Sequence, residues 1–138
     1  MAGYSGTPLA KKIGIKEGSR IALVNAPEDF LSELGELPDN VQFIKGPAKA
    51  LDIILLFVLT ERALARDFAK HAARLTANGM LWIGWPKKSS GVVTDLSEQR
   101  VRVIGLDAGL VDVKVCAINE IWSGLKFVYR LKDRSILK

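Results

Sequence analysis

The segment LDIILLFVL, residues 51–59, limits most strongly what this chain can fold into. From Ile53 to Leu59 every side chain is apolar, so a strand formed here carries hydrophobic groups on both faces. Such a strand suits the middle of a parallel sheet that helices cover on both sides. The run is far shorter than the roughly 18 apolar residues of a membrane span. The sequence therefore predicts a buried central strand and no membrane segment.

Shorter helix and strand signals alternate on both sides of this run. Thr7 as a cap and Gly14 as a stop predict a short helix, and EDFLSELGEL predicts another. The longest predicted helix runs from Thr60 to Asn78, with its apolar residues on one arc at about 100° per residue. Further strands are predicted at RIALV, NVQFIKG, MLWIGW, LVDVKVCAI and LKFVYRL, the last two forming a hairpin around Trp122-Ser123-Gly124.

This alternation is typical of an α/β fold with three layers and a mostly parallel sheet, here closed by a C-terminal antiparallel β-hairpin. A chain of 138 residues suits one domain over residues 1–138. In such sheets ligands bind beyond the carboxyl ends of the strands. That edge is predicted to carry NAP after the first strand, LTER after the central strand and WPKKSSG after the next.

Composition restricts the setting and the partners. One cysteine excludes an internal disulfide, and the start MAGYSGTPLAKK lacks the apolar stretch of a signal peptide, so we expect a cytoplasmic protein. The net charge of +5 comes entirely from residues 51–138, and much of it lies in the tail KFVYRLKDRSILK. Such a tail is either a solvated edge strand or a surface for nucleic acid or acidic protein, and only charge supports the second alternative.

The loop after MLWIGW is the candidate anion-binding site. Asp95 and Glu98 have the spacing of a capping box, which predicts a helix near residues 96–104. Helix N-termini leave N–H groups free and attract anions, although the Asp95 carboxylate would compete for those groups. A polar turn with solvated lysines is the alternative. The candidate anion-binding residues are Lys87, Lys88, Ser89, Ser90, Gly91 and Thr94.

Three further residues are the candidate rim of a pocket at the same edge. Trp82 and Trp85 are three residues apart, so a strand directs them to opposite faces, with Trp82 in the core and Trp85 at the strand end. Trp122 in the predicted turn is either a pocket wall or a packing residue. Asn25, Trp85 and Trp122 are therefore assigned to the rim.

No residue is assigned a catalytic role. His71, the only histidine, lies on the apolar arc of its helix, and we expect it to be structural. Cys116 is expected to be a small core residue, and Asp52 a turn or cap residue at the opposite end of its strand. One histidine, one cysteine and scattered carboxylates offer no metal-ligand spacing, so no metal site is predicted.

The order of elements resembles the Rossmann-like fold of class I methyltransferases, which bind S-adenosylmethionine. The likeness is carried by ALDII before the central strand, by LTANGMLWI and by the terminal hairpin. The resemblance implies that the last strand inserts antiparallel beside the strand MLWIGW, which would bring Trp122 near Trp85. Over its full length, from GYSGTPLAKK to VCAINEIWSGLKFV, the sequence also resembles a family of small bacterial proteins to which no activity is assigned.

The sequence departs from the methyltransferase pattern at two cofactor positions. The glycine-rich turn after the first strand is replaced by Asn25-Ala26-Pro27-Glu28, and the acidic residue after the second strand by FIKGPAK. About six residues separate that second strand from the central one, too few for a normal parallel crossover. Either a strand and its helix are missing, or the second strand runs in the opposite direction.

Three functions are compatible with this sequence. The first is a non-catalytic or degenerate methyltransferase-like domain, without a cofactor, that binds an anionic small molecule or a protein partner. The second is an S-adenosylmethionine-dependent methyltransferase with an altered cofactor pocket. The third is a basic adaptor for nucleic acid or acidic protein. In the first, the rim residues are Asn25, Trp85, Lys87, Lys88, Ser89 and Trp122.

Overall fold

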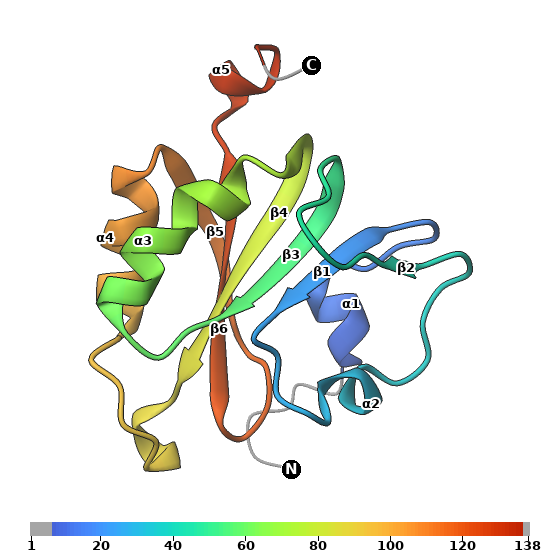
Figure 1. The fold of residues 1–138 in the computed structure, drawn as a ribbon. Helices are drawn as coiled ribbons and strands as arrows, with labels where there is room; N and C mark the ends of the chain where they lie inside the picture. Colours follow the sequence, from blue (N-terminus) through green and yellow to red (C-terminus); the bar gives the residue numbers. More distant parts are fainter. Residues whose placement is uncertain (1–6, 137–138) are drawn as a thin grey trace.

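The computed structural model describes residues 7–136 as a six-stranded sheet with helices on both faces (Figure 1). The strand order is β2-β1-β3-β4-β6-β5; the first four are parallel, β6 is antiparallel to β4, and β5 is antiparallel to β6. The predicted α/β class and the antiparallel hairpin are therefore confirmed. The elements are α1 (Leu9–Ile13), β1 (Arg20–Val24), α2 (Phe30–Leu34), β2 (Gln42–Phe43), β3 (Leu51–Phe57), α3 (Glu61–Ala72), β4 (Leu75–Pro86), η1 (Lys88–Ser90), α4 (Glu98–Asp107), β5 (Leu110–Ala117), β6 (Trp122–Tyr129) and α5 (Leu131–Arg134).

The apolar run that led the sequence argument is the inner strand β3, between β1 and β4. Ile54 and Leu56 pack into the core on the face that α3 and α4 cover. Ile53 and Leu55 pack into the core on the face of α1 and α2. None of these four side chains is more than 1% exposed. Both faces of the central strand are thus buried, as its sequence predicts.

The two helical layers contact the sheet closely. Against β6, α4 approaches through Gly105, where an added Cβ would lie only 2.1 Å from Cε1 of Phe127. The Phe127 ring packs edge-to-face on Phe68 of α3 at 5.1 Å between centroids. On the other face, Trp82 donates its indole N–H to the carbonyl oxygen of Ile13 at 2.9 Å. Trp82 is fully buried, so its prediction as a core residue is confirmed.

The longest helix is shorter than its apolar arc indicates. α3 begins at the Thr60 cap, as predicted, but ends at Ala72, and β4 already begins at Leu75. The backbone N–H of Leu51 donates to the carbonyl oxygen of Arg74 at 3.0 Å, which brings this part of the chain into the sheet. The prediction that the helix continues to Asn78 is wrong. Leu75 fits the apolar arc of a longer helix, but its side chain is equally well buried as the first residue of β4, so the apolar pattern does not distinguish the two.

Two turns also differ from the sequence prediction. α1 ends at Gly14 in the left-handed conformation, as expected, but its cap position is Pro8, and no side chain, including that of Thr7, caps its amides. The chain between β5 and β6 turns at residues 118–121. Trp122 is therefore the first residue of β6 rather than part of the turn. The backbone N–H of Trp122 donates to Asn119 Oδ1 at 2.8 Å, and this bond closes the turn.

The second strand is parallel to β1, so the chain must return across β1 to start β3. Residues 44–50 make this crossover without a helix, on the face that α3 covers (Figure 1). The Arg74 guanidinium holds the segment: Nη2 donates to the carbonyl oxygen of Gly46 at 2.7 Å, and Nε donates to that of Ala48 at 2.9 Å. One side chain thus supplies hydrogen bonds for a segment that is too short to form a helix and return.

Candidate functional site

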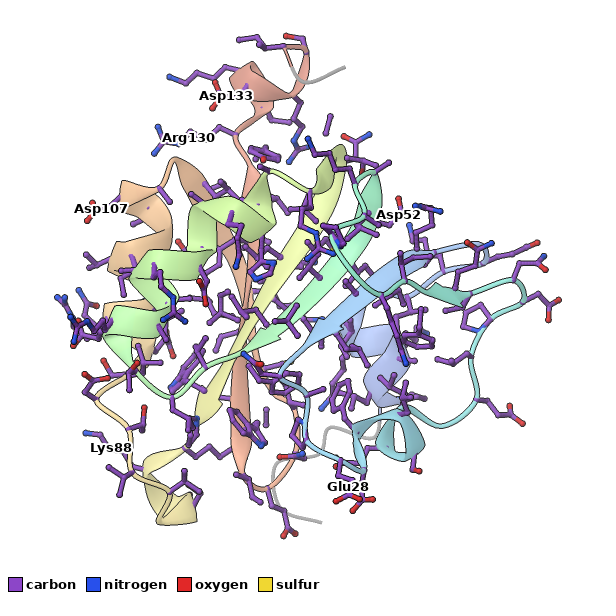
Figure 2. The ribbon with its side chains drawn as sticks, in the orientation of Figure 1. Glu28, Asp52, Lys88, Asp107, Arg130 and Asp133 are labelled. Carbon is purple, nitrogen blue, oxygen red and sulfur yellow. The ribbon has the colours of Figure 1, made fainter. Side chains whose placement is uncertain are left out.

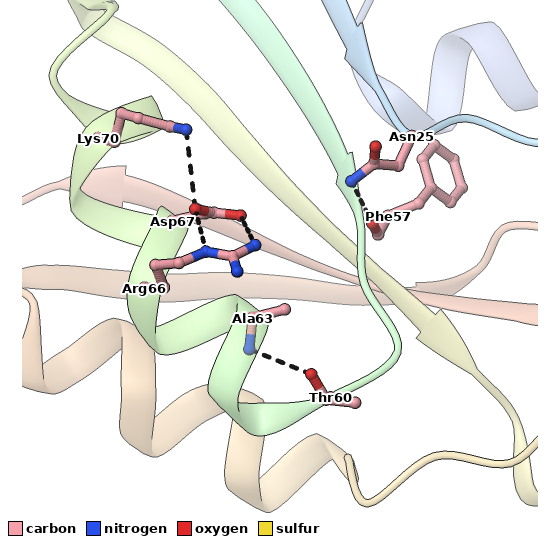
Figure 3. Close-up of polar contacts among 7 residues, drawn as sticks. All are labelled: Asn25, Phe57, Thr60, Ala63, Arg66, Asp67 and Lys70. Carbon is pink, nitrogen blue, oxygen red and sulfur yellow. Dashed lines mark hydrogen bonds and ion pairs between the residues drawn. The ribbon is translucent and has the colours of Figure 1, made fainter.

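The carboxyl ends of β1 and β3 form the topological switch point of the sheet. The chain leaves β1 toward β2 on one side, whereas β3 lies on the other side of β1, and open α/β sheets bind ligands at such a point. Asn25 follows β1 with φ of 58°, in the left-handed region that asparagine tolerates better than most residues. Its Nδ2 donates to the carbonyl oxygen of Phe57 at 3.4 Å, which links the two strand ends (Figure 3).

The three predicted rim residues do not surround one cavity. Asn25 is exposed, but Trp85 is only 5% exposed and packs in the core under α3 and α4. Trp122 packs on the opposite face, where its ring meets Phe57 edge-to-face at 5.1 Å. Trp122 pairs with Pro86 across the sheet, so the predicted proximity of the two tryptophans along the strands is correct. Their rings nevertheless lie on opposite faces.

The predicted anion loop is built largely from contacts with itself and its neighbours. Ser90 Oγ donates to the carbonyl oxygen of Lys87 at 2.6 Å and accepts from the N–H of Val92 at 3.1 Å. Lys87 is half-buried, and its own backbone N–H donates to Ile121. Lys88 is exposed on the η1 turn at one corner of the molecule (Figure 2). Ser89 and Gly91 are exposed beside it.

The helix start behind this loop is not where the capping box predicts it. Ser97, rather than Asp95, caps α4 and accepts from the N–H of Arg100 at 3.2 Å. Asp95 instead accepts from the N–H of Glu61 at 2.8 Å and caps α3. Thr94 is bonded to the carbonyl oxygen of Leu59. The predicted anion loop therefore does not lie directly on a helix N-terminus. The free N–H groups of a helix start, which supported an anion site there, are not available to it.

A cavity of about 420 Å³ lies along β1 and extends from Asn25 at the switch point to Arg74, beside the amino end of β3. We call it the β1 cavity. Its volume is within the range of small-ligand sites, roughly 300–1,000 Å³. It lies in the region where residues 44–50 pass over the sheet without a covering helix. The lining residues are Ala22, Leu23, Val24, Asn25, Ile44, Lys45, Gly46, His71 and Arg74.

The lining combines an apolar floor with positive charge. Lys45 and Arg74 are its charged residues, and the lining contains no carboxylate. His71 is buried, and its Nδ1 lies 3.0 Å from Nη1 of Arg74. Arginine can only donate, so Nδ1 accepts and the neutral ring carries its proton on Nε2. Burial, then the charges of Arg74 and Lys70, lower the pKa of His71 below its usual value. The cavity lining therefore combines a neutral imidazole with two cations.

The sequence argument identified Asn25 in this cavity but missed Lys45 and Arg74. Lys45 belongs to FIKGPAK, where the methyltransferase resemblance expects an acidic residue, and this charge reversal was the available signal. Arg74 left no comparable signal, since its partners at residues 46 and 48 are remote in sequence. His71 was expected to be structural, and its bond to Arg74 supports that role without excluding contact with a ligand.

A larger groove of about 990 Å³ lies between α1 and α2. Its surface is mainly aliphatic, with Leu9, Ile15 and Leu34 among the lining residues. Lys16 and Glu36 are also present, so charges of both signs line it. It has no set of converging polar groups of one kind. The β1 cavity is therefore the stronger candidate site, although it is the smaller of the two.

The remaining sequence predictions concern Asp52, metals and membranes. Asp52 lies at the amino end of its strand, as expected, but it is the second residue of β3 and not part of a turn; its Oδ2 accepts from the N–H of Arg20 at 2.8 Å and links the starts of β3 and β1. Within residues 7–136 no group of three histidine, cysteine, aspartate or glutamate residues is placed to hold a metal ion. In the same range no helix is long and apolar enough to cross a membrane.

Comparison with known proteins identifies the fold. No family model matches the sequence, and no curated protein matches it. An S-adenosylmethionine-dependent methyltransferase from Aquifex aeolicus has a TM-score of 0.63 at 17% identity, over 86% of each chain. A TehB-like methyltransferase from Corynebacterium glutamicum has a TM-score of 0.58 at 13% identity, over 88% of this chain and 85% of that one.

A third similar structure contains the cofactor. Fibrillarin from Aeropyrum pernix, solved with natively bound S-adenosyl-L-methionine, has a TM-score of 0.57 at 17% identity, over 91% of this chain and 70% of that one. At such identities the likeness shows the fold and not the activity. The chain thus has the class I methyltransferase architecture in a reduced form.

Proposed function

We propose that this reduced methyltransferase-like fold binds a small anionic molecule in the β1 cavity and does not catalyse methyl transfer. The observation that carries the proposal is the cavity lining along β1, which has Lys45, His71 and Arg74 and no carboxylate. An anion there gains charge-assisted hydrogen bonds, which are roughly twice as strong as neutral ones. Ala22, Val24 and Ile44 supply an apolar surface for the uncharged part of the ligand.

The proposal retains the ligand class expected from the sequence and changes the site. In the predicted loop the hydroxyls of Ser90 and Thr94 are bonded to backbone groups, and its lysines line neither of the two cavities described above. Asn25 is the one predicted site residue that the β1 cavity includes. Lys45 is the residue best suited for mutation, because it is exposed and forms no side-chain bond within the described chain.

A thermal-shift series tests the proposal with inorganic phosphate, pyrophosphate and adenosine monophosphate at constant ionic strength. A ligand present at 100 times its dissociation constant adds about 2.7 kcal/mol to the free energy of unfolding. We expect at least one probe to raise the melting temperature of the wild type, and Lys45→Gln to abolish the rise. Lys88→Gln is the matched control, since it removes one exposed lysine from the loop predicted by sequence.

The control separates the two sites. If Lys88→Gln abolishes the response and Lys45→Gln leaves it unchanged, the ligand binds at the loop and the β1 cavity proposal is wrong. If neither variant changes the response, binding is elsewhere and the proposal is also wrong. If no probe shifts the melting temperature of the wild type, the proposed ligand class is wrong.

The second candidate function is S-adenosylmethionine-dependent methyl transfer. The observation that favours it is the left-handed backbone at Asn25, at the turn where the resemblance expects glycine. Lys45 is unfavourable, because it follows β2 where that resemblance expects an acidic residue for the ribose hydroxyls. Titration with S-adenosylmethionine and its demethylated product decides between the functions. Thermal stabilisation by both molecules, retained in Lys45→Gln, would favour the enzyme over the anion-binding domain.

A further inference from the structure

The uncharged wall of the β1 cavity is aliphatic. Ala22 and Val24 pack on the α3 face of the sheet, and Ile44 packs against the same core. Leu23 lies between them in the sequence and packs on the opposite face, as strand alternation requires. Within residues 7–136, no phenylalanine, tyrosine or tryptophan lines the cavity. The wall therefore fits a short aliphatic group better than a flat aromatic one.

The lining is poorly equipped to bind a nucleoside. Bases gain affinity by stacking on aromatic faces, but the one aromatic ring of the lining, His71, is only 6% exposed. Dinucleotide-binding sheets hold the ribose hydroxyls with an aspartate or glutamate, and no carboxylate of the described chain lines this cavity. Its volume of about 420 Å³ is also near the lower end of the range for small-ligand sites.

Two cationic side chains remain to bind the anionic group of a smaller ligand. Each guanidinium nitrogen of Arg74 makes one hydrogen bond within the chain. A guanidinium carries more N–H donors than these bonds use, so Arg74 can bind an oxyanion while it holds the crossover. Lys45 adds an exposed ammonium group. A phosphate monoester, which carries close to two negative charges at neutral pH, matches the two cations better than a carboxylate does.

We propose that the ligand of the β1 cavity is a phosphate monoester with a short aliphatic body, and that Val24 contributes to its selection. The phosphate contacts Lys45 and Arg74, and the aliphatic body lies against Ala22, Val24 and Ile44. This inference rests on the function proposed above, because both place an anion in the same cavity. It goes further in excluding nucleotides as the preferred ligands.

Calorimetric titration tests this ligand class with inorganic phosphate, ethyl phosphate, butyl phosphate, pentanoate and adenosine monophosphate, at constant pH and ionic strength. Burial of one CH₂ group raises affinity roughly fourfold. We therefore expect butyl phosphate to bind about 15-fold more tightly than ethyl phosphate. Adenosine monophosphate should bind no more tightly than ethyl phosphate. Pentanoate should bind more weakly than butyl phosphate, because it carries one charge.

Variants assign the gain to the cavity wall. Val24→Thr keeps the size of the side chain but adds a hydroxyl to the wall. It should reduce the ratio of butyl to ethyl affinity to about threefold or less and leave binding of inorganic phosphate unchanged. Val115→Thr is the matched control, since it makes the same change at an exposed position of β5 outside the cavity. Lys45→Gln should abolish binding of every phosphate in the series.

The ligand series separates this inference from the proposed function. A gain for butyl phosphate that is lost in Val24→Thr and kept in Val115→Thr supports the inference. Equal affinities for ethyl and butyl phosphate, with binding abolished by Lys45→Gln, retain an anion site and overturn the aliphatic ligand.

The other outcomes also decide. Tighter binding of adenosine monophosphate than of butyl phosphate overturns the inference, and so does pentanoate binding as tightly as butyl phosphate. A gain that survives in Val24→Thr overturns the role of Val24. If no phosphate compound binds, the proposed function fails and this inference fails with it.

Discussion

Replacing Arg74 by methionine tests whether one side chain holds the crossover that lacks a helix. The change keeps an unbranched apolar stem but removes the guanidinium bonds to the carbonyl oxygens of Gly46 and Ala48 and to His71 Nδ1. Hydrogen bonds to charged groups contribute about 1.5–3 kcal/mol each when buried. These are part-buried or exposed, so we expect about 2–3 kcal/mol for all three together.

Urea unfolding of Arg74→Met measures this loss as a lower midpoint with an unchanged slope. Hydrogen exchange gives the location, since the amides of residues 44–50 should lose protection before those of β3. Arg66→Met is the matched control, because Arg66 is an arginine of α3, the helix that ends just before Arg74, and its pair with Asp67 is on the surface. Arg74→Lys should fall between the two, since an ammonium cannot form the fork. Equal midpoints for Arg74→Met and Arg66→Met would refute the reasoning.

Three further predictions concern packing, pH and capping. Gly105→Ala should lower the free energy of unfolding by about 2 kcal/mol, measured in urea, because overpacking against Phe127 exceeds the gain in helix propensity; Phe127→Leu in the same chain should recover part of the loss, and a stabilised single variant would contradict the packing. Because the pKa of His71 is lowered in the folded state, the unfolded state binds a proton at this imidazole first as the pH falls. The free energy of unfolding of the wild type should therefore decrease relative to that of His71→Gln as the pH falls from the ordinary value of 6.5 through the folded-state pKa. Ser97→Ala should cost about 1 kcal/mol by loss of the α4 cap, and an unchanged urea midpoint would refute that role.

The sheet could be predicted from the sequence because each strand is indicated by the pattern of neighbouring residues. The apolar run of β3 and the alternation that places Trp82 and Trp85 on opposite faces depend only on strand geometry, and both predictions hold. The end of α3 was missed because Leu75 satisfies the helical arc as well as the strand. Asp95 fits a capping box by spacing, but its carboxylate contacts Glu61 at the start of α3, and sequence spacing contains no information on that tertiary contact.

The candidate site was less predictable than the fold for the same reason. The β1 cavity combines Asn25, Lys45 and Arg74 from three separate segments. It exists because residues 44–50 cross the sheet without a helix, and the length of that connection alone left two topologies open. The sequence predicted an anionic ligand at the carboxyl edge of the sheet, and it favoured the loop in which lysines and hydroxyls are adjacent. The adjacent lysines and hydroxyls of that loop form no cavity, whereas the cavity residues come from segments far apart in the sequence.

The imidazole of His71 offers the most direct test of the central claim that an anion binds in the β1 cavity. His71 is the only histidine of the chain, so its NMR signals can be followed without assignment of other rings. Its pKa should lie below the ordinary value in the free protein and rise when pyrophosphate is added at constant ionic strength, because a bound anion favours the imidazolium. Lys45→Gln should abolish the rise. An identical titration curve with and without pyrophosphate would contradict the account.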